Sequence, residues 1–140
     1  AMTMMISTRG RYALRVMIDL AEQSNGQRIP LKDIAQRQHI SQKYVEGIMT
    51  TLSKNGLVSG VHGKGGGYCL TREPKDYSTG EILNLTEGTL APVSCLGADA
   101  APCERASDCK TLPLWTKLDE IIQNYLNSVT LEDLIDGNPL

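Results

Sequence analysis

Three cysteines in one short segment are the side chains of this chain best suited to metal or redox chemistry. Cys95, Cys103 and Cys109 form the pattern Cys-x7-Cys-x5-Cys in a stretch rich in Gly, Ala, Pro and Asp. Thiolates are soft ligands that bind iron–sulfur clusters and zinc. Cysteine pairs in structural zinc sites are typically about two to four residues apart, so the wider spacing favours a cluster. A zinc site and a thiol redox switch stay open as alternatives.

The remaining cysteine and the two histidines add no catalytic site. Cys69 alternates into a predicted strand, where we expect a small buried apolar side chain. Neither His39 nor His62 is beside a candidate nucleophile or a pair of carboxylates. Lys64 precedes Gly65 instead of ending a phosphate-loop motif, which excludes a loop of the NTPase type. We therefore expect a protein that is not an enzyme.

Three helical patterns in the first half of the chain predict a helix–turn–helix. The first pattern runs from Ser7 to Gln23, and the second begins after Pro30. The third begins at Ser41, a good N-cap, and stops at Asn55-Gly56. His39 lies in the turn before it, where we expect left-handed backbone geometry. The third helix has one apolar face that we expect in the core, formed by Val45, Ile48, Met49 and Leu52.

A β-hairpin follows these helices. Two short apolar runs, residues 57–61 and 68–71, flank the sequence His62-Gly63-Lys64-Gly65-Gly66-Gly67. Glycine permits the positive φ angles of a tight tip and a close approach to a ligand. Helices followed by such a hairpin are the elements of a winged helix–turn–helix. The predicted fold is mainly α with a small β-hairpin wing, followed by a long C-terminal helix.

The exposed first turn of the third helix has the side chains that a DNA-reading surface needs. Gln42 can pair with adenine, Lys43 can contact guanine or phosphate, and Glu46 can accept a hydrogen bond from cytosine. At the hairpin tip, Lys64 and His62 can reach a backbone or a minor groove. The complete set of predicted DNA-binding residues is Arg11, Ser41, Gln42, Lys43, Tyr44, Glu46, His62, Gly63, Lys64 and Gly65.

The second half of the chain predicts helices around an irregular segment. We expect a helix capped by Thr79 and ending near Glu87, irregular structure over residues 88–110, and an amphipathic helix from Leu114 to Ser128. A short helix over residues 130–135 follows. Apolar residues of the long helix recur at steps of three and four, namely Trp115, Leu118, Ile122, Tyr125 and Val129. This heptad spacing is typical of a helix that pairs with a partner, and packing on its own domain is the alternative.

The charge divides at the same place as these elements. Residues 1–72 carry ten Lys and Arg against four acidic residues, a net +6. Residues 73–140 carry four basic against twelve acidic residues, a net −8. A basic half favours a polyanionic partner. We predict a DNA-binding domain over residues 1–72, and over residues 73–140 a helix, a cysteine-containing sensor loop and a dimerisation helix.

Several motifs together resemble one family over residues 6 to 136. They are Ser7-Thr8-Arg9-Gly10-Arg11-Tyr12-Ala13, Ser41-x-x-Tyr44-x-Glu46, Asn55-Gly56-Leu57-Val58, Gly63-x-Gly65-Gly66-Gly67-Tyr68-x-Leu70, Leu114-Trp115 and Thr130-Leu131-x-Asp133-Leu134. The chain resembles the IscR, NsrR and CymR family of bacterial winged-helix regulators. The resemblance implies a cytoplasmic transcriptional regulator that binds double-stranded promoter DNA as a homodimer, paired through the helix around Trp115–Val129. No apolar run approaches the roughly 18 residues of a membrane span, so no membrane partner is expected.

The same resemblance implies a 2Fe-2S cluster on Cys95, Cys103 and Cys109, because the IscR-like members bind one on three such cysteines. The fourth ligand stays open. IscR-like members have a histidine where this chain has Leu112, and NsrR-like members have a carboxylate where it has Arg11. The candidates for the fourth ligand are Asp99, Glu104, Asp108, His39 of a partner subunit, or a thiol from outside the chain.

Overall fold

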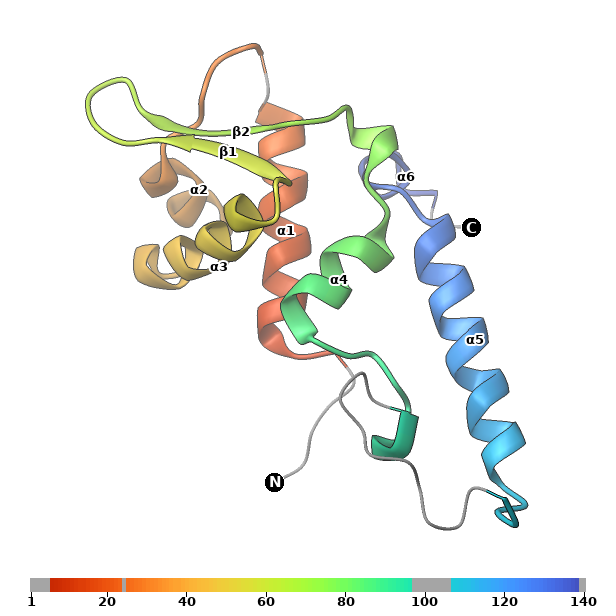
Figure 1. Cartoon of the computed structure of the whole chain (residues 1–140). Coiled ribbons are helices and arrows are strands. Elements are labelled where there is room, and N and C mark those ends of the chain that lie inside the picture. The colour runs from red at the N-terminus through yellow and green to blue at the C-terminus, as the bar shows by residue number, and fades with distance from the viewer. Residues whose placement is uncertain (1–5, 24, 97–106, 139–140) are drawn as a thin grey trace.

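The computed structural model describes residues 6–23, 25–96 and 107–138 of the chain. Within them, a cluster of helices carries a two-stranded antiparallel sheet on one side and a long helix on the other (Figure 1). The elements in chain order are α1 (Thr8–Gln23), α2 (Leu31–Gln38), α3 (Gln42–Lys54), β1 (Val58–Val61), β2 (Gly67–Leu70), η1 (Pro74–Asp76), α4 (Thr79–Glu87), η2 (Ser94–Leu96), α5 (Leu112–Ser128) and α6 (Leu131–Asp136). This order confirms a mainly α fold with a small hairpin wing.

The helix–turn–helix forms as the sequence predicts. The apolar face of α3 is buried and packs in one cluster with Val16, Met17 and Leu20 of α1. The Ser41 hydroxyl accepts a hydrogen bond from the Tyr44 N–H at 3.1 Å, which caps α3. His39 ends α2 at φ 56° and ψ 44°, the left-handed geometry expected for this turn. The core and the two caps therefore fix the start of α3 relative to α1.

The hairpin is antiparallel, with Val58 opposite Leu70 and Val61 opposite Gly67. Compared with the predicted runs, β1 begins one residue later and β2 begins and ends one residue earlier. A third segment supports it, because Ile29 and Tyr68 exchange backbone hydrogen bonds of 2.8 Å. Gly67 has φ 145°, and a Cβ atom there would lie 2.6 Å from the Ile29 carbonyl group. The linker before α2 thus holds the tip-side end of β2 in place.

The helix α4 joins the two halves of the chain. Its N-cap is Ser78, whose hydroxyl accepts from the Glu81 N–H at 3.0 Å, so the predicted cap at Thr79 is wrong by one residue. Thr79 instead donates from its hydroxyl to the Val129 carbonyl at 2.9 Å. The buried Tyr77 hydroxyl donates to the Leu57 carbonyl at 2.7 Å. One core cluster therefore includes residues on both sides of the predicted boundary at residue 72.

The long helix α5 begins at Leu112, two residues before its predicted start, and has no buried residue. It packs against α4, where the Asn84 side-chain amide donates to Gln123 Oε1 at 3.2 Å. The short helix α6 follows, with a capping box between Thr130 and Asp133. In the described part of the chain, no helix has the length and apolar character needed to cross a membrane.

Candidate DNA-binding surface and cysteine site

The first turn of α3 presents its polar side chains to solvent. Ser41, Gln42, Lys43, Tyr44 and Glu46 are all exposed, because the buried face of α3 points the other way. The Tyr44 ring meets the Tyr12 ring of α1 edge to face, with ring centroids 5.6 Å apart. This contact holds Tyr44 on the surface next to the side chains available for base and phosphate contacts.

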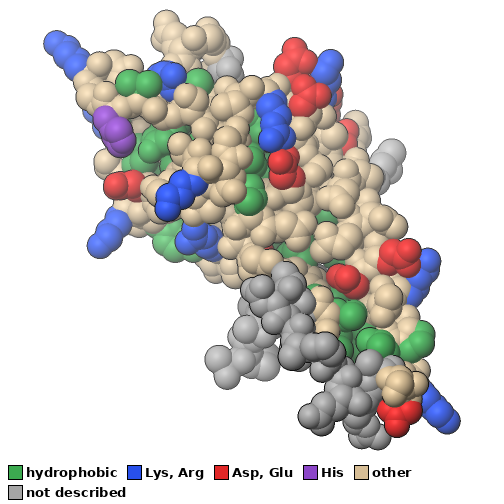
Figure 2. Space-filling model, in the orientation of Figure 1, with side chains coloured by type: hydrophobic (Ala, Val, Ile, Leu, Met, Phe, Trp, Pro, Cys, Tyr) green, Lys and Arg blue, Asp and Glu red, His purple; other side chains and the backbone are tan. Residues whose placement is uncertain are grey.

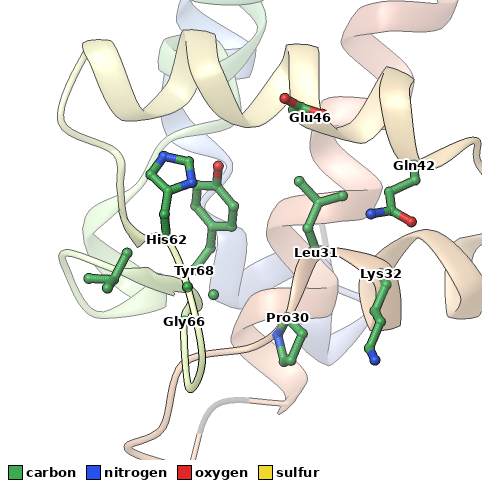
Figure 3. A pocket seen from close by; sticks show the side chains of 11 residues that line it. Pro30, Leu31, Lys32, Gln42, Glu46, His62, Gly66 and Tyr68 are labelled. Carbon is green, nitrogen blue, oxygen red and sulfur yellow. The ribbon is translucent and has the colours of Figure 1, made fainter.

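A groove of about 380 Å³ separates α3 from the hairpin. Figure 3 shows Gln42 and Glu46 on α3, with His62 and Tyr68 of the hairpin across the groove. Leu31 and Lys32, at the start of α2, form its third side. The groove thus brings together predicted site residues from α3 and from the hairpin that follows it.

Gly63 also lines this groove, and the remaining predicted residues lie outside it. Lys64 and Gly65 are exposed at the hairpin tip, where Gly63 has φ 93° and Gly65 has φ 78°. These positive values confirm why the tip is rich in glycine. Arg11 is exposed in the first turns of α1, where its guanidinium donates to the Thr8 hydroxyl at 3.3 Å. Its role as a DNA contact stays a prediction.

A buried carboxylate positions the turn that precedes α3. Asp19 of α1 is 2% exposed and accepts from Arg37 Nη2 at 2.7 Å and Nε at 3.0 Å. It also accepts from the Gln38 side-chain amide at 2.9 Å. The hydrogen bond to Asp19 raises the pKa of Arg37. Arg15 donates to the carbonyl and the side chain of Gln38. This network holds the end of α2 on α1, just before the turn.

The sequence reasoning missed this network. Asp19 and Arg37 are eighteen positions apart, and no local spacing links them. The available signal was an acidic residue next to Leu20, which belongs to the apolar stripe of α1. Such a residue in a helix that packs into a core needs a partner when it is buried.

The cysteine segment, residues 88–111, lies between α4 and α5. Cys95 is in η2 and is half-buried. Cys109 is also half-buried, and its Sγ lies 3.4 Å from the Thr111 hydroxyl just before α5. Cys103 is outside the described residues, as are the candidate ligands Asp99 and Glu104. The chemistry of the two described thiols fits a site for a soft metal, since both are on the same segment and neither is fully buried.

Two further ligand candidates have different surroundings. Asp108 is exposed beside Cys109, whereas His39 lies in the turn between α2 and α3. Cys69 is half-buried on β2 opposite Ser59, so the expected full burial is wrong. Among the residues that the structure describes, no three His, Cys, Asp or Glu side chains form a group that could hold a metal ion. The predicted ligand set includes Cys103, which is outside the described residues.

The distribution of charge follows the two halves of the chain. In Figure 2, several Lys and Arg side chains surround the end of the molecule that carries the histidine, and acidic side chains predominate toward the other end. The sequence pattern of the Rrf2 family, described as an iron-dependent transcriptional regulator, matches residues 6–137. This chain belongs to the Rrf2 family. It is a DNA-binding transcriptional regulator.

The relatives of this Rrf2 protein have the same fold and kind of function. It is 36% identical over 137 residues to the HTH-type transcriptional regulator IscR of Klebsiella pneumoniae (strain 342), covering 98% of this chain and 83% of that protein. Among solved structures, it is similar to CymR (YrzC), the global cysteine regulator of B. subtilis, at a TM-score of 0.76 and 36% identity, covering 98% and 99% of the two chains. It is also similar to T. potens IscR, at a TM-score of 0.72 and 34% identity, covering 94% and 86%. These relatives are transcriptional regulators, which confirms the expectation that the Rrf2 protein is not an enzyme.

Proposed function

We propose that this Rrf2 protein is a homodimeric regulator that senses iron–sulfur or redox status through a 2Fe-2S cluster on Cys95, Cys103 and Cys109. The observation that carries the proposal is the position of the two described thiols. Cys95 and Cys109 are both half-buried. They lie in the segment between α4, which contacts α1, and α5, which exposes an apolar face. The likeness to IscR proteins over nearly the whole chain supports the cluster rather than another soft metal.

When bound, the cluster supplies a metal centre whose presence and oxidation state depend on iron supply and redox conditions. The residues of the chain have the remaining tasks. The three thiolates hold the ligand, and Thr111 lies within hydrogen-bond reach of one of them. Hydrogen bonds to the sulfur ligands and limited solvent access change the reduction potential of such a site. The fourth ligand stays open, with Asp108 as the described candidate on the same segment.

The apolar face of α5 supports a homodimer. Leu114, Leu118, Ile121 and Tyr125 are 59%, 37%, 54% and 47% exposed. They recur at steps of four, three and four, which places them on one face of the helix. Part of the stripe expected from the sequence lies elsewhere, because Val129 is buried within the chain and Trp115 and Ile122 are half-buried. A second copy of α5 would cover the exposed face in a two-fold arrangement.

On DNA, the first turn of α3 would enter the major groove and the hairpin tip would lie on the flanking backbone. Gln42 and Glu46 are exposed and line the groove between α3 and the wing, where their side chains can reach base edges. Lys64 is placed for phosphate or minor-groove contact. A two-fold dimer would read two half-sites about 34–36 Å apart, or a multiple of that spacing.

The cluster is tested by anaerobic reconstitution followed by visible absorption and by iron, sulfide and zinc analysis. We expect a coloured protein that contains iron and sulfide, and we expect Cys95→Ser and Cys109→Ser each to lose most of the colour. Cys69→Ser is the matched control and should keep the cluster, because Cys69 is on the wing. A colourless, iron-free product would contradict the cluster. Zinc bound in place of iron would instead support the alternative site, and cysteine-dependent redox effects without metal would support a thiol switch.

A further inference from the structure

The last residue of α4 contacts the first turn of α1. Glu87 Oε1 accepts hydrogen bonds from the Ser7 backbone N–H at 3.0 Å and from the Ser7 hydroxyl at 2.7 Å. Glu87 and Ser7 are eighty positions apart, so the contact depends on the tertiary fold. Gly88 follows Glu87 and ends α4 with φ 79°. The cysteine segment therefore begins immediately after the residue that binds the start of α1.

Gly10 makes this contact possible. A Cβ atom at position 10 would overlap Glu87 Oε1 and would lie 3.1 Å from Leu83 Cδ2. Gly10 is buried under α4, and its N–H points to the Ser7 hydroxyl at 3.5 Å. A carboxylate at a helix N-terminus is also favoured by the helix dipole. The end of α4 is thus closely fitted to α1 through charge, hydrogen bonding and shape.

The same turn of α1 also contacts α3. Arg9 Nη2 donates to the Thr51 hydroxyl of α3 at 2.5 Å. Thr51 is on the helix whose first turn carries Gln42 and Glu46. This bond links the start of α1 to α3 at a point away from the predicted DNA-contacting side chains. Two short links, Glu87 to Ser7 and Arg9 to Thr51, connect the end of α4 with α3.

We propose that Glu87 is a positioning residue that couples the state of the cysteine segment to the orientation of α3, through Ser7 and the Arg9–Thr51 hydrogen bond. The proposal rests on the proposed function for its signal, and it adds the residue through which that signal reaches the DNA-binding surface. The two arrangements are Glu87 bound to Ser7 and Glu87 withdrawn from it. An effector changes DNA affinity only when it has different affinities for two such arrangements.

The first test compares DNA affinity in the cluster-loaded and cluster-free protein, by fluorescence anisotropy on one promoter fragment. The measured quantity is the ratio of the two dissociation constants. In the wild type we expect a ratio in the range of allosteric couplings, roughly 5–150-fold. We expect Glu87→Ala to bring the ratio closer to one. Glu87→Gln keeps an acceptor for Ser7 and should retain part of the ratio. Thr51→Val should reduce it as Glu87→Ala does, whereas the control Glu22→Gln, at the exposed far end of α1, should leave it unchanged.

The second test needs no cluster. Hydrogen exchange of the metal-free protein reports the protection of backbone amides in α1 and α3. We expect Glu87→Ala to increase exchange in the first turn of α1 and in α3 around Thr51, and Thr51→Val to increase it in α3. If the role of Glu87 were merely local, exchange would increase only in α1 and at the end of α4. Protection of α3 that is unchanged in Glu87→Ala would overturn the proposal.

The outcomes separate this proposal from the proposed function. A wild-type ratio of one would overturn both, because the cysteine segment would then send no signal. A wild-type ratio different from one that persists in Glu87→Ala would overturn the coupling role of Glu87 and leave the cluster sensor intact. If Glu87→Ala does not fold, Glu87→Gln and Thr51→Val decide, and an unchanged ratio in both would overturn the proposal.

Discussion

The helices α3 and α5 differ in which side chains they leave to solvent. Four apolar residues of α3 are buried in the core of the chain, and its exposed first turn is polar. The longer α5 has no buried residue and exposes Leu114, Leu118, Ile121 and Tyr125. A polar exposed turn suits the hydrated, charged surface of DNA. An exposed apolar face suits a protein surface of the same kind.

The difference supports a proposed division of tasks, in which α3 reads DNA and α5 holds two copies together. The core stabilises α3 within one copy, so its polar residues are available to a ligand. In contrast, α5 is held on one side by α4 through contacts such as Asn84 with Gln123. In the proposed dimer, a second copy of α5 would cover its other side. Changes on the α5 face should therefore affect assembly, and changes on the α3 face should affect base preference.

The largest effect should come from a charge on the apolar face of α5. Ile121→Glu would place a carboxylate in each half of the proposed interface, where an unpaired buried charge costs about 3–5 kcal/mol. We expect the dimer to dissociate at least about 100-fold more readily and specific DNA binding to fall with it. Sedimentation velocity and DNA titration measure the two effects. Asn124→Glu, on an exposed face away from the stripe, is the matched control, and equal dimerisation in both variants would remove α5 from the interface.

The next effect should appear on α3 and should leave assembly unchanged. Glu46→Ala would remove an acceptor that can select cytosine, and one base contact discriminates by about 1–3 kcal/mol. We therefore expect a changed preference at one base pair of each half-site. Competition binding with a library of half-sites measures this preference. Glu22→Ala is the control for loss of one acidic residue. An equal change of affinity on every sequence would show that Glu46 does not read a base.

The sequence predicted α3 better than α5 for a physical reason. Local capping patterns predict the N-cap Ser41 and the turn residue His39, and one helical period predicts the buried face of α3. The structure confirms all three. Apolar residues occupy two sides of α5. Trp115 and Ile122 share one side, and Leu114 and Ile121 share another, so the helical spacing allows either side to face the core. Only packing against α4 decides which side faces inward.

Contacts between distant parts of the chain were beyond local patterns. The bonds of Asp19 with Arg37 and of Glu87 with Ser7 join α1 to other helices. Their residues carry no motif, because each is an ordinary polar side chain until the fold brings its partner near. The cysteine spacing was visible from the start. The position of Cys103 lies outside the described residues, so its role as a ligand stays a prediction.

A smaller effect should distinguish the basic half from the acidic half. Lys64→Ala at the hairpin tip would remove one phosphate contact in each protomer. We expect weaker binding to all sequences and a slope of log affinity against log salt that is smaller by about one unit per bound protomer. Lys117→Ala, an exposed lysine of α5, should leave the slope unchanged. Equal slopes in wild type and Lys64→Ala would show that the tip does not contact phosphate.

The smallest effect should come from helix caps, which have similar energies in both regions but different consequences. Ser41→Ala removes the cap of α3, and Thr130→Ala removes the cap of α6. Each should lower the free energy of unfolding by about 1 kcal/mol, measured by urea denaturation. Only Ser41→Ala should also weaken DNA binding, because α3 begins at the predicted DNA-binding surface. Ser41→Asn restores a capping acceptor and should recover the stability. If Thr130→Ala weakened DNA binding as much as Ser41→Ala, general stability rather than the order of the first turn of α3 would control DNA affinity. That result would contradict the proposed division of tasks between α3 and the C-terminal helices.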